Sequence, residues 1–154
     1  MADWFLDSSA IVKRYVRETG TNWVRTIVAP AAGHRAFVSG ITGVEVIAAI
    51  TRRKSGAGVS PADAAAALRD FRRDFANEYW VLDVIPSVLA RAMTLAETHG
   101  LRGYDAVQLA TVLEDHNHRL AAGMPSLTFV SADHALNTAA QAEGLLVDNP
   151  NAHP

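Results

Sequence analysis

Short apolar runs that alternate with longer stretches of helical periodicity are the feature that most constrains how this chain folds. The apolar runs are bounded by turn or capping residues and predict strands at residues 4–6, 36–38, 80–85, 127–130 and 145–147. Helical patterns fill the intervals, and we expect helices from Ser8 to Gly20, at residues 23–28 and 41–54, from Pro61, from Pro86, from about Asp105 and at residues 135–142. Strands separated by helices in this way pair in parallel through right-handed crossovers. We therefore predict an α/β fold, a three-layer α/β/α sandwich with helices on both faces of a central, mainly parallel sheet.

Capping residues mark several of these helix boundaries. Ser60-Pro61-Ala62-Asp63 supplies an N-cap, a proline at the first helical position and an early acid. Ser8-Ser9 offers a cap for the first helix, which Gly20 is expected to end. Gly56-Ala57-Gly58 is expected to break the chain between two helices.

The composition suits a single folded domain, which we expect to span residues 1–154. The chain has no Pro/Gly/Ser-rich linker, and 49% of its residues are hydrophobic, which is enough for a full core. It contains no cysteine, so folding does not depend on disulfides, and we expect a cytoplasmic protein. We see no basic-then-apolar leader and no segment apolar and long enough to span a bilayer, so no membrane partner is expected.

The net charge offers no general attraction for a polyanion, because it is -2 at pH 7. A nucleic-acid partner would therefore have to bind local basic patches. The candidates are Arg52-Arg53-Lys54, the set Arg69, Arg72 and Arg73, and the set Lys13, Arg14 and Arg17. Each has the spacing of a solvated helix face, for which surface solubility is the simpler explanation.

Acidic residues follow two of the predicted strands closely. Asp7 comes directly after the first strand, and Asp133 comes shortly after the fourth. The carboxyl ends of parallel strands lie on one edge of the sheet, where open α/β proteins bind ligands, so we expect both acids at that edge. Helix capping explains each of them, taken singly, about as well as catalysis does.

Glu45 is the clearest chemical anomaly, because its helical neighbours Ile41, Ala48 and Ala49 place a carboxylate within an apolar stripe. An unpaired charge in such a stripe is costly. If Thr42 is the N-cap, Glu45 closes a capping box, and if Ser39 is the N-cap, Glu45 lies too deep in the helix to do so. The preceding strand favours Ser39, and we therefore expect Glu45 to have a cation or metal as its partner.

Asp105 opens a helix that is apolar nearly all round, as is typical of a buried helix. An acid at the positive end of that helix has either a structural or a functional role. Carboxylates without cysteine, and without histidines paired at helical spacing, are hard oxygen ligands that suit Mg²⁺ or Mn²⁺ better than Zn²⁺. Such ions activate water and neutralise phosphate charge, so the sequence indicates phosphoryl chemistry.

Four segments together resemble the PIN domain family, and the resemblance runs almost end to end. They are Leu6-Asp7-Ser8-Ser9-Ala10, residues 39–45, Gly103-Tyr104-Asp105-Ala106-Val107-Gln108-Leu109-Ala110 and Phe129-Val130-Ser131-Ala132-Asp133. The chain's length is similar to that of the VapC toxins of bacterial and archaeal toxin-antitoxin pairs.

The resemblance implies an Mg²⁺- or Mn²⁺-dependent endoribonuclease that acts on structured RNA such as tRNA or rRNA. It places Asp7, Glu45, Asp105 and Asp133 at the positions of the family's catalytic, metal-binding acids. It also implies supporting roles for Ser131, which would hydrogen-bond a carboxylate or a metal-bound water, and for Ser9, although turn and capping roles suit both serines at least as well. A homodimer is implied, together with a cognate VapB-like antitoxin whose C-terminal segment occupies the acidic pocket.

Two other α/β site types fit poorly. A receiver-like phosphoacceptor domain expects adjacent acids after the first strand and a late lysine, whereas Ser8-Ser9 follow Asp7 and the only lysines are Lys13 and Lys54. A nucleotide-binding fold fits still less well, because Gly56-x-Gly58 is followed by Pro61 at the third glycine's place and the sequence has no Gly-Lys pair. The serious alternative is a catalytically silent PIN-like module that binds RNA or a partner without cleaving it.

Two further groups have simpler structural explanations. A second metal site is suggested by the cluster Glu114, Asp115, His116 and His118, but its two histidines point to different helix faces, so we expect a solvated helix end. RNA stacking is open to the tryptophans Trp4, Trp23 and Trp80, but their apolar surroundings favour core or dimer contacts.

Overall fold

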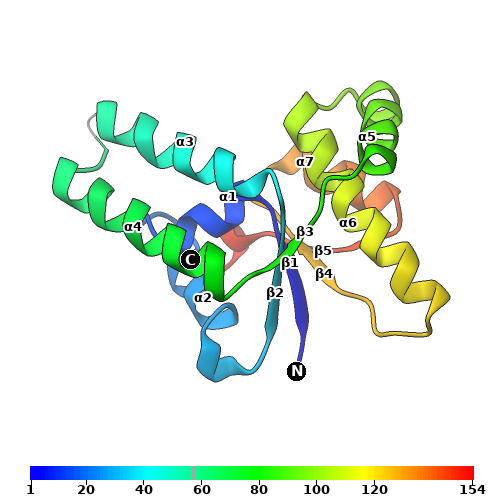
Figure 1. Ribbon diagram of the computed structural model, residues 1–154, viewed down its shortest axis with the longest axis horizontal. Coiled ribbons are helices and arrows are strands. Elements are labelled where there is room, and N and C mark those ends of the chain that lie inside the picture. Colours follow the sequence, from blue (N-terminus) through cyan, green and yellow to red (C-terminus); the bar gives the residue numbers. More distant parts are fainter. Residues whose placement is uncertain (57) are drawn as a thin grey trace.

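Parallel strands form one central sheet, in agreement with the predicted fold class (Figure 1). The structure is a computed structural model that describes residues 1–56 and 58–154, so Ala57, at the centre of the predicted break, lies outside the described residues. Within the described part of the chain the sheet has five strands in the order β3-β2-β1-β4-β5. Their bounds are Asp3–Leu6 (β1), Arg35–Ser39 (β2), Trp80–Leu82 (β3), Thr128–Val130 (β4) and Leu146–Asp148 (β5).

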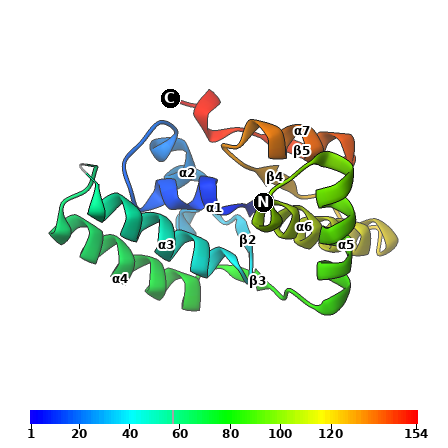
Figure 2. The same ribbon diagram turned by 90° about the horizontal axis from the view of Figure 1, so that it is seen from above.

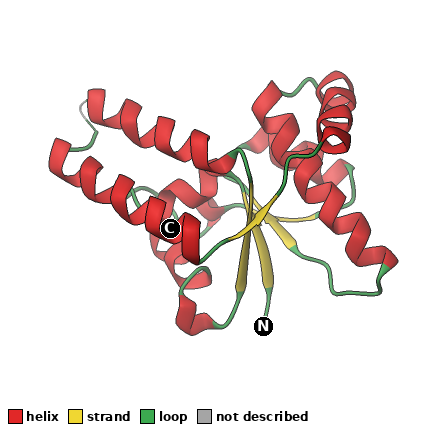
Figure 3. Cartoon of the chain, in the orientation of Figure 1, coloured by secondary structure: helices red, strands yellow, loops and turns green. Residues whose placement is uncertain are grey.

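Helices cover both faces of the sheet, which gives the predicted three layers (Figure 3). One face carries Ser8–Ile11 (α1), Thr21–Ile27 (α2), Thr42–Ser55 (α3) and Pro61–Asn77 (α4). The other face carries Pro86–His99 (α5), Gly103–Ala121 (α6) and His134–Ala142 (α7). Short 3-10 turns lie at Val12–Arg14 (η1), Pro30–Ala32 (η2) and Pro150–Ala152 (η3).

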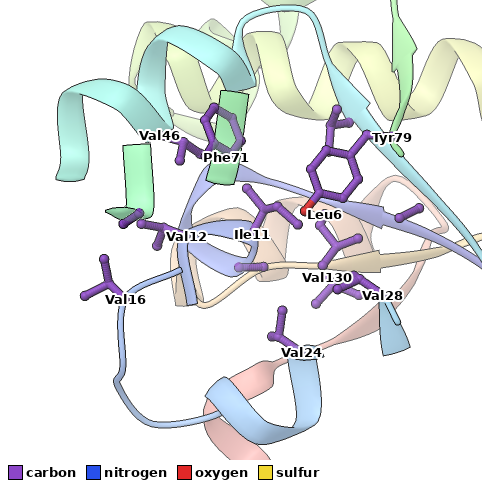
Figure 4. Close-up of a cluster of buried hydrophobic side chains, with 14 of the residues drawn as sticks. Leu6, Ile11, Val12, Val16, Val24, Val28, Val46, Phe71, Tyr79 and Val130 are labelled. Atoms are coloured by element: carbon purple, nitrogen blue, oxygen red, sulfur yellow. The ribbon is translucent and has the colours of Figure 1, made fainter. Parts of the chain in front are cut away.

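The period of the strands divides the core in two. Successive strand residues point to opposite faces. Phe5 and Phe129 therefore pack beneath α5, α6 and α7, while Leu6 and Val130 pack against α1, α3 and α4 (Figure 4). All four side chains are fully buried, and each contributes roughly 1.5–3 kcal/mol to folding by leaving water. Two such cores hold the sheet rigidly between the helical layers, and this rigidity fixes its carboxyl edge.

The first helix is shorter than predicted. Helix α1 ends at Ile11 and tightens into η1, and Gly20 precedes α2 as its N-cap instead of ending the first helix. Gly20 has a φ of 84°, and a Cβ placed on it would lie 2.3 Å from the carbonyl oxygen of Pro150. The tertiary contact with η3, rather than a helix end, therefore accounts for this glycine.

Strand β3 is also shorter than predicted, because it ends at Leu82 instead of residue 85. It lies at the edge of the sheet and pairs only with β2, whose last residue, Ser39, is opposite Leu82. Beyond that pair β3 has no neighbouring strand to continue the ladder, and the chain leaves toward Pro86 at the start of α5.

One predicted surface patch is wrong. Lys13 is only 5% exposed and pairs with Glu18 at 3.7 Å. Arg14 binds Glu78 at 2.8 Å and approaches Asp74 at 3.4 Å, which ties η1 to the end of α4. These cations are occupied by carboxylates within the fold, so they are not available to a polyanion.

The structure also tests the tryptophans. Trp4 and Trp23 are partly buried and pack edge to face, with their ring centres 5.8 Å apart, as expected of core residues. Trp80 is 56% exposed and therefore is not a core residue.

No helix in the described part of the chain is both long enough and apolar enough to cross a membrane.

Candidate active site

The order of the strands brings the first two predicted acids together. Strands β1 and β4 are neighbours, with Leu6 opposite Val130, and the backbone N–H of Asp7 donates to the carbonyl of Val130 at 3.1 Å. Asp7 and Asp133 therefore follow adjacent strands at the carboxyl edge. In Figure 1 the strands run upward from the N-terminus, and α1 and the first turns of α3 and α6 lie beyond that edge.

Asp7 is the N-cap of α1, a position that the sequence assigned to Ser8-Ser9. Its Oδ1 accepts a hydrogen bond from the backbone N–H of Ala10 at 3.0 Å and another from Ser9 Oγ at 2.7 Å. Its Oδ2 accepts from Ser131 Oγ at 2.7 Å. The side chain is thus held in one orientation from both the β1 and the β4 side of the edge.

The environment of Asp7 favours a proton. Burial, with a smaller contribution from the negative charge of Asp105, raises the pKa of its carboxyl to about 7. The hydrogen bonds that Asp7 accepts act in the opposite direction, because they stabilise the ionised form. A buried carboxylate with a second acid nearby is the arrangement that a bound cation would relieve.

A pair of serine hydroxyls joins the two strand ends. Ser131 Oγ accepts from the backbone N–H of Asp133 at 3.0 Å while it donates to Asp7. Ser9 Oγ accepts from the N–H of Ala132 at 2.9 Å and lies 3.3 Å from Ser131 Oγ. Asn137 on α7 donates to the carbonyl of Ser131 at 2.8 Å. The loop after β4 is therefore tied to α1 through side chains that also contact Asp7.

Asp133 caps α7 and keeps one oxygen free. Its Oδ1 accepts from the N–H of Leu136 at 2.8 Å. Its Oδ2 accepts no hydrogen bond from any described residue. Capping and ligand binding are thus compatible on the same carboxylate, because they use different oxygens.

Asp105 is not a helix cap. Helix α6 begins at Gly103 with Arg102 at the N-cap, so Asp105 lies inside the first turn, and among the described residues no donor reaches its carboxylate. Burial raises the pKa of Asp105, and the charges of Asp133 and Glu45 raise it further, whereas Arg102 lowers it. The charges of two other predicted acids, Asp133 and Glu45, therefore act on Asp105.

Glu45 forms no capping box, and both predicted caps of α3 are wrong. The N-cap is Ile41, without a side-chain hydrogen bond, and Thr42 is the first helical residue. The Glu45 carboxylate instead accepts from Gln108 Nε2 at 2.7 Å, and the same amide nitrogen donates to Thr42 Oγ1 at 3.0 Å. Within the protein the partner of Glu45 is therefore an amide, and a metal at Glu45 stays a prediction.

Gln108 is a residue to which the sequence assigned no role. It is 1% exposed on an otherwise apolar part of α6, and its Oε1 is buried without a hydrogen-bond partner among the described residues. The sequence did contain a sign of this role, because Gln108 lies one turn after Asp105 and interrupts an apolar run. An unpartnered buried oxygen beside a carboxylate accepts readily from a water molecule.

Two adjoining cavities border two of the four predicted acids, Glu45 and Asp105. One, of about 360 Å³, runs along α1 and α3 past Ser9 and Glu45, and the other, of about 630 Å³, reaches Asp105 and Arg102 at the start of α6. Both are lined by Glu45, Arg52 and Tyr104. A ligand therefore has access to Glu45 and Asp105 from the surface, whereas Asp7 and Asp133 line neither of these cavities.

The carboxylate oxygens of the predicted acids are the kind of ligand that a hard divalent cation prefers, but within the described residues the acids are not spaced as a ready ligand set. Asp105, Asp133 and Glu45 each retain a carboxylate oxygen without a protein donor, as hard cations require. However, no three Asp, Glu or His side chains in residues 1–56 and 58–154 stand in a ready ligand set. At the end of α6, where the sequence favoured a solvated helix end over a second metal site, Glu114 pairs with Arg91 at 3.7 Å and Asp115 pairs with Arg119.

Fold and site together define a parallel α/β protein with acids gathered at the carboxyl edge of β1 and β4. The chain belongs to the PIN domain family, whose model matches residues 4–138. It is 32% identical over 143 residues to Ribonuclease VapC45 of Mycobacterium tuberculosis, an alignment that covers 93% of this chain and 92% of the relative.

Solved structures show the same fold. PAE2754 from Pyrobaculum aerophilum superimposes with a TM-score of 0.65 at 18% identity, covering 99% of this chain and 86% of that one. A toxin-antitoxin complex from Klebsiella pneumoniae gives a TM-score of 0.61 at 16% identity, covering 97% and 98% of the two chains.

Proposed function

We propose that this chain is a metal-dependent endoribonuclease, the toxin of a toxin-antitoxin pair, that hydrolyses phosphodiester bonds in structured RNA such as tRNA or rRNA. The observation that carries the proposal is geometric: Asp7 and Asp133 follow the neighbouring strands β1 and β4, and Gln108, one turn after Asp105 on α6, donates to Glu45 at 2.7 Å. The similarity to Ribonuclease VapC45 over nearly the whole chain supports the reaction class.

The proposed catalytic and metal-binding residues are Asp7, Glu45, Asp105 and Asp133. When bound there, an Mg²⁺ or Mn²⁺ ion would supply an activated water molecule and neutralise charge on the phosphate. The contribution of the protein's other residues is to orient the carboxylates. The serine hydroxyls and the Ala10 N–H hold the Asp7 carboxylate, and Gln108 holds Glu45 toward α6. Oxygens without protein donors on Asp105 and Asp133 remain for the ion.

The proposal includes two protein partners. A cognate antitoxin is supported by the fold similarity to a structure solved as a toxin-antitoxin complex. A homodimer is supported by α5 and its N-cap Ile85: the side chains of Ile85, Leu89 and Met93 recur every fourth residue and are 46%, 47% and 74% exposed. Such a stripe on one helix suits burial against a second copy. Light scattering of the purified chain tests the dimer.

The experiment that tests the nuclease is cleavage of total RNA by the purified chain in Mg²⁺ or Mn²⁺. Asp7→Asn and Asp105→Asn should each abolish cleavage, because each removes a charge from the proposed metal site. Glu97→Gln, which changes an exposed acid on α5, is the matched control and should cleave like wild type. Equal cleavage by wild type and both aspartate variants would sink the assignment. RNA binding without cleavage in any of them would indicate the silent module instead.

A further inference from the structure

The last strand of the sheet is held at its carboxyl end by a histidine. His153 follows η3, and its Nε2 lies at hydrogen-bond distance, 2.8 Å, from Oδ1 of Asp148, the last residue of β5. The His153 ring also stacks on Trp23 of α2, with ring centres 4.2 Å apart and ring planes 6° apart. Figure 2 shows the C-terminus beside α2. We define these three residues, Asp148, His153 and Trp23, as the C-terminal clamp.

Strand β5 has little else to hold it in place. It is a three-residue strand at the edge of the sheet, it pairs only with β4 among the described strands, and its Leu146 is 61% exposed. A short edge strand with few buried contacts opens readily at its ends. The clamp opposes this opening, because it fixes the residues that follow Asp148 onto α2.

The end of β5 contacts the acidic site through Ser131. The backbone N–H of Ser131 donates to the carbonyl of Asp148 at 3.2 Å, one residue beyond the last pair of the β4–β5 ladder. The Ser131 hydroxyl donates to Asp7 Oδ2 at 2.7 Å and accepts from the backbone N–H of Asp133 at 3.0 Å. A shift of the Ser131 backbone would therefore disturb one proposed metal ligand and the loop that carries another.

Trp23 connects the clamp to the same edge by a second route. Its ring packs edge to face against Trp4 of β1, with ring centres 5.8 Å apart, and Asp7 directly follows β1. In the sheet, β1 and β5 are the two strands that flank β4. The clamp thus restrains both neighbours of the strand that leads into Ser131.

We propose that Asp148 and His153 are positioning residues of the acidic site, which hold Ser131, and through its hydroxyl Asp7, in the orientation that metal binding requires. The proposal rests on the proposed function for the role of Asp7, whereas the contacts that carry it lie outside the four acids. Supporting contacts around metal ligands typically contribute about 10- to 100-fold to metal affinity or activity. The clamp therefore makes the site depend on a segment that no local pattern connects with it.

Amide hydrogen exchange of the metal-free chain, followed by NMR, tests the clamp without a nuclease assay. His153→Ala removes the stacked ring and the bond to Asp148, and it should lower the protection of the Ser131 and Asp133 amides about 10-fold or more. His153→Phe keeps the ring and should lose less. Amides between β1 and β2 should keep their protection, because the substitution opens one edge of the sheet and not the whole fold. His118→Ala, which changes an exposed histidine on α6, is the matched control.

Two results of the exchange experiment overturn the proposal. Equal loss of protection throughout the chain would show that His153 only stabilises the fold. Unchanged protection of Ser131 and Asp133 in His153→Ala would show that the influence of the clamp ends at β5.

A double-mutant cycle tests the step from the clamp to the metal site, read as the Mn²⁺ concentration that gives half-maximal RNA cleavage. His153→Ala should raise this concentration about 10-fold or more. In a Ser131→Ala background the same substitution should add little, because the contact through which it acts is already lost. Additive effects would contradict the route through Ser131. If wild type does not cleave RNA, the nuclease proposal fails, and the exchange experiment by itself decides whether the clamp holds Ser131.

Discussion

The Asp7 carboxylate is at once a helix cap and a buried charge. Capping requires only that one oxygen accept the N–H of Ala10, which an asparagine also allows. The charge is a separate matter, because it is buried and lies near Asp105. Substitution by asparagine therefore separates the structural task of this residue from its electrostatic one.

Asp7→Asn should change how stability depends on pH. The carboxyl ionises near 3.8 in the unfolded chain, and its pKa is about 7 in the metal-free fold, so between these values the folded state holds one more proton. The free energy of unfolding should therefore fall as pH rises from about 4 to about 7, by roughly 4 kcal/mol at 1.36 kcal/mol per pKa unit. The variant should lose this slope and be the more stable protein above pH 7. Urea denaturation in EDTA from pH 4 to pH 8 measures this, and an unchanged slope would contradict the buried charge.

Gln108→Met should impair metal use more than folding. Methionine is similar in size but cannot donate to Glu45 or Thr42, so Glu45 loses its orientation. Loss of such supporting contacts typically lowers metal affinity or activity about 10- to 100-fold. RNA cleavage should need correspondingly more Mn²⁺, with a melting temperature close to that of wild type. Gln141→Met, on the exposed side of α7, is the control. An unchanged Mn²⁺ dependence would show that Gln108 only fills space.

At the scale of elements, η3 is docked onto α2 at the far end of the chain. Figure 2 shows the C-terminus beside α2. His153, directly after η3, stacks on Trp23 with ring centres 4.2 Å apart, and it contacts Asp148 at 2.8 Å. The close approach of Pro150 to Gly20 completes this contact. The segment around η3, which lies far from α2 in sequence, thereby covers one side of the core that contains Leu6 and Val130.

Gly20→Ala should destabilise the fold strongly, by more than the roughly 1–2 kcal/mol that a left-handed backbone alone costs a residue with a Cβ. The added methyl would also collide with the Pro150 carbonyl. Gly33→Ala is the matched control, because Gly33 has a φ of 66° and a methyl added there would meet nothing within 4 Å. Guanidinium denaturation of both variants gives the comparison. Equal losses would mean that η3 moves aside at no cost.

At the scale of the whole molecule, cation binding should couple to stability. The uncompensated acids at the carboxyl edge weaken the metal-free fold as they ionise, and an ion that binds only the folded state stabilises it by about 2.7 kcal/mol at 100 times its Kd. Mn²⁺ should therefore raise the melting temperature, and more so at pH 8 than at pH 6. Asp105→Asn should reduce the shift, while Glu97→Gln should not. A melting temperature that does not respond to Mn²⁺ in wild type would count against the metal site.

Local patterns in the sequence determined the order of the strands and helices and the placement of two of the acids at one edge of the sheet. Apolar period and capping residues predicted the strand and helix order, including Ser60 at the start of α4 and Pro86 at the start of α5. They also predicted that Asp7 and Asp133 lie at the same edge of the sheet. These features depend on residues close together in the chain, so one sequence suffices to predict them.

Only the tertiary structure decided which surfaces meet. The placement of β1 between β2 and β4, the amide of Gln108 against Glu45 and the burial of Lys13 arise from packing between segments far apart in sequence. The N-cap of α3, Ile41, also differs from local preference, and Thr42, which the sequence offered as a cap, instead accepts a hydrogen bond from Gln108 on α6. Helical spacing predicted that Glu45 needs a partner, and the packing of α3 against α6 determined which one it has.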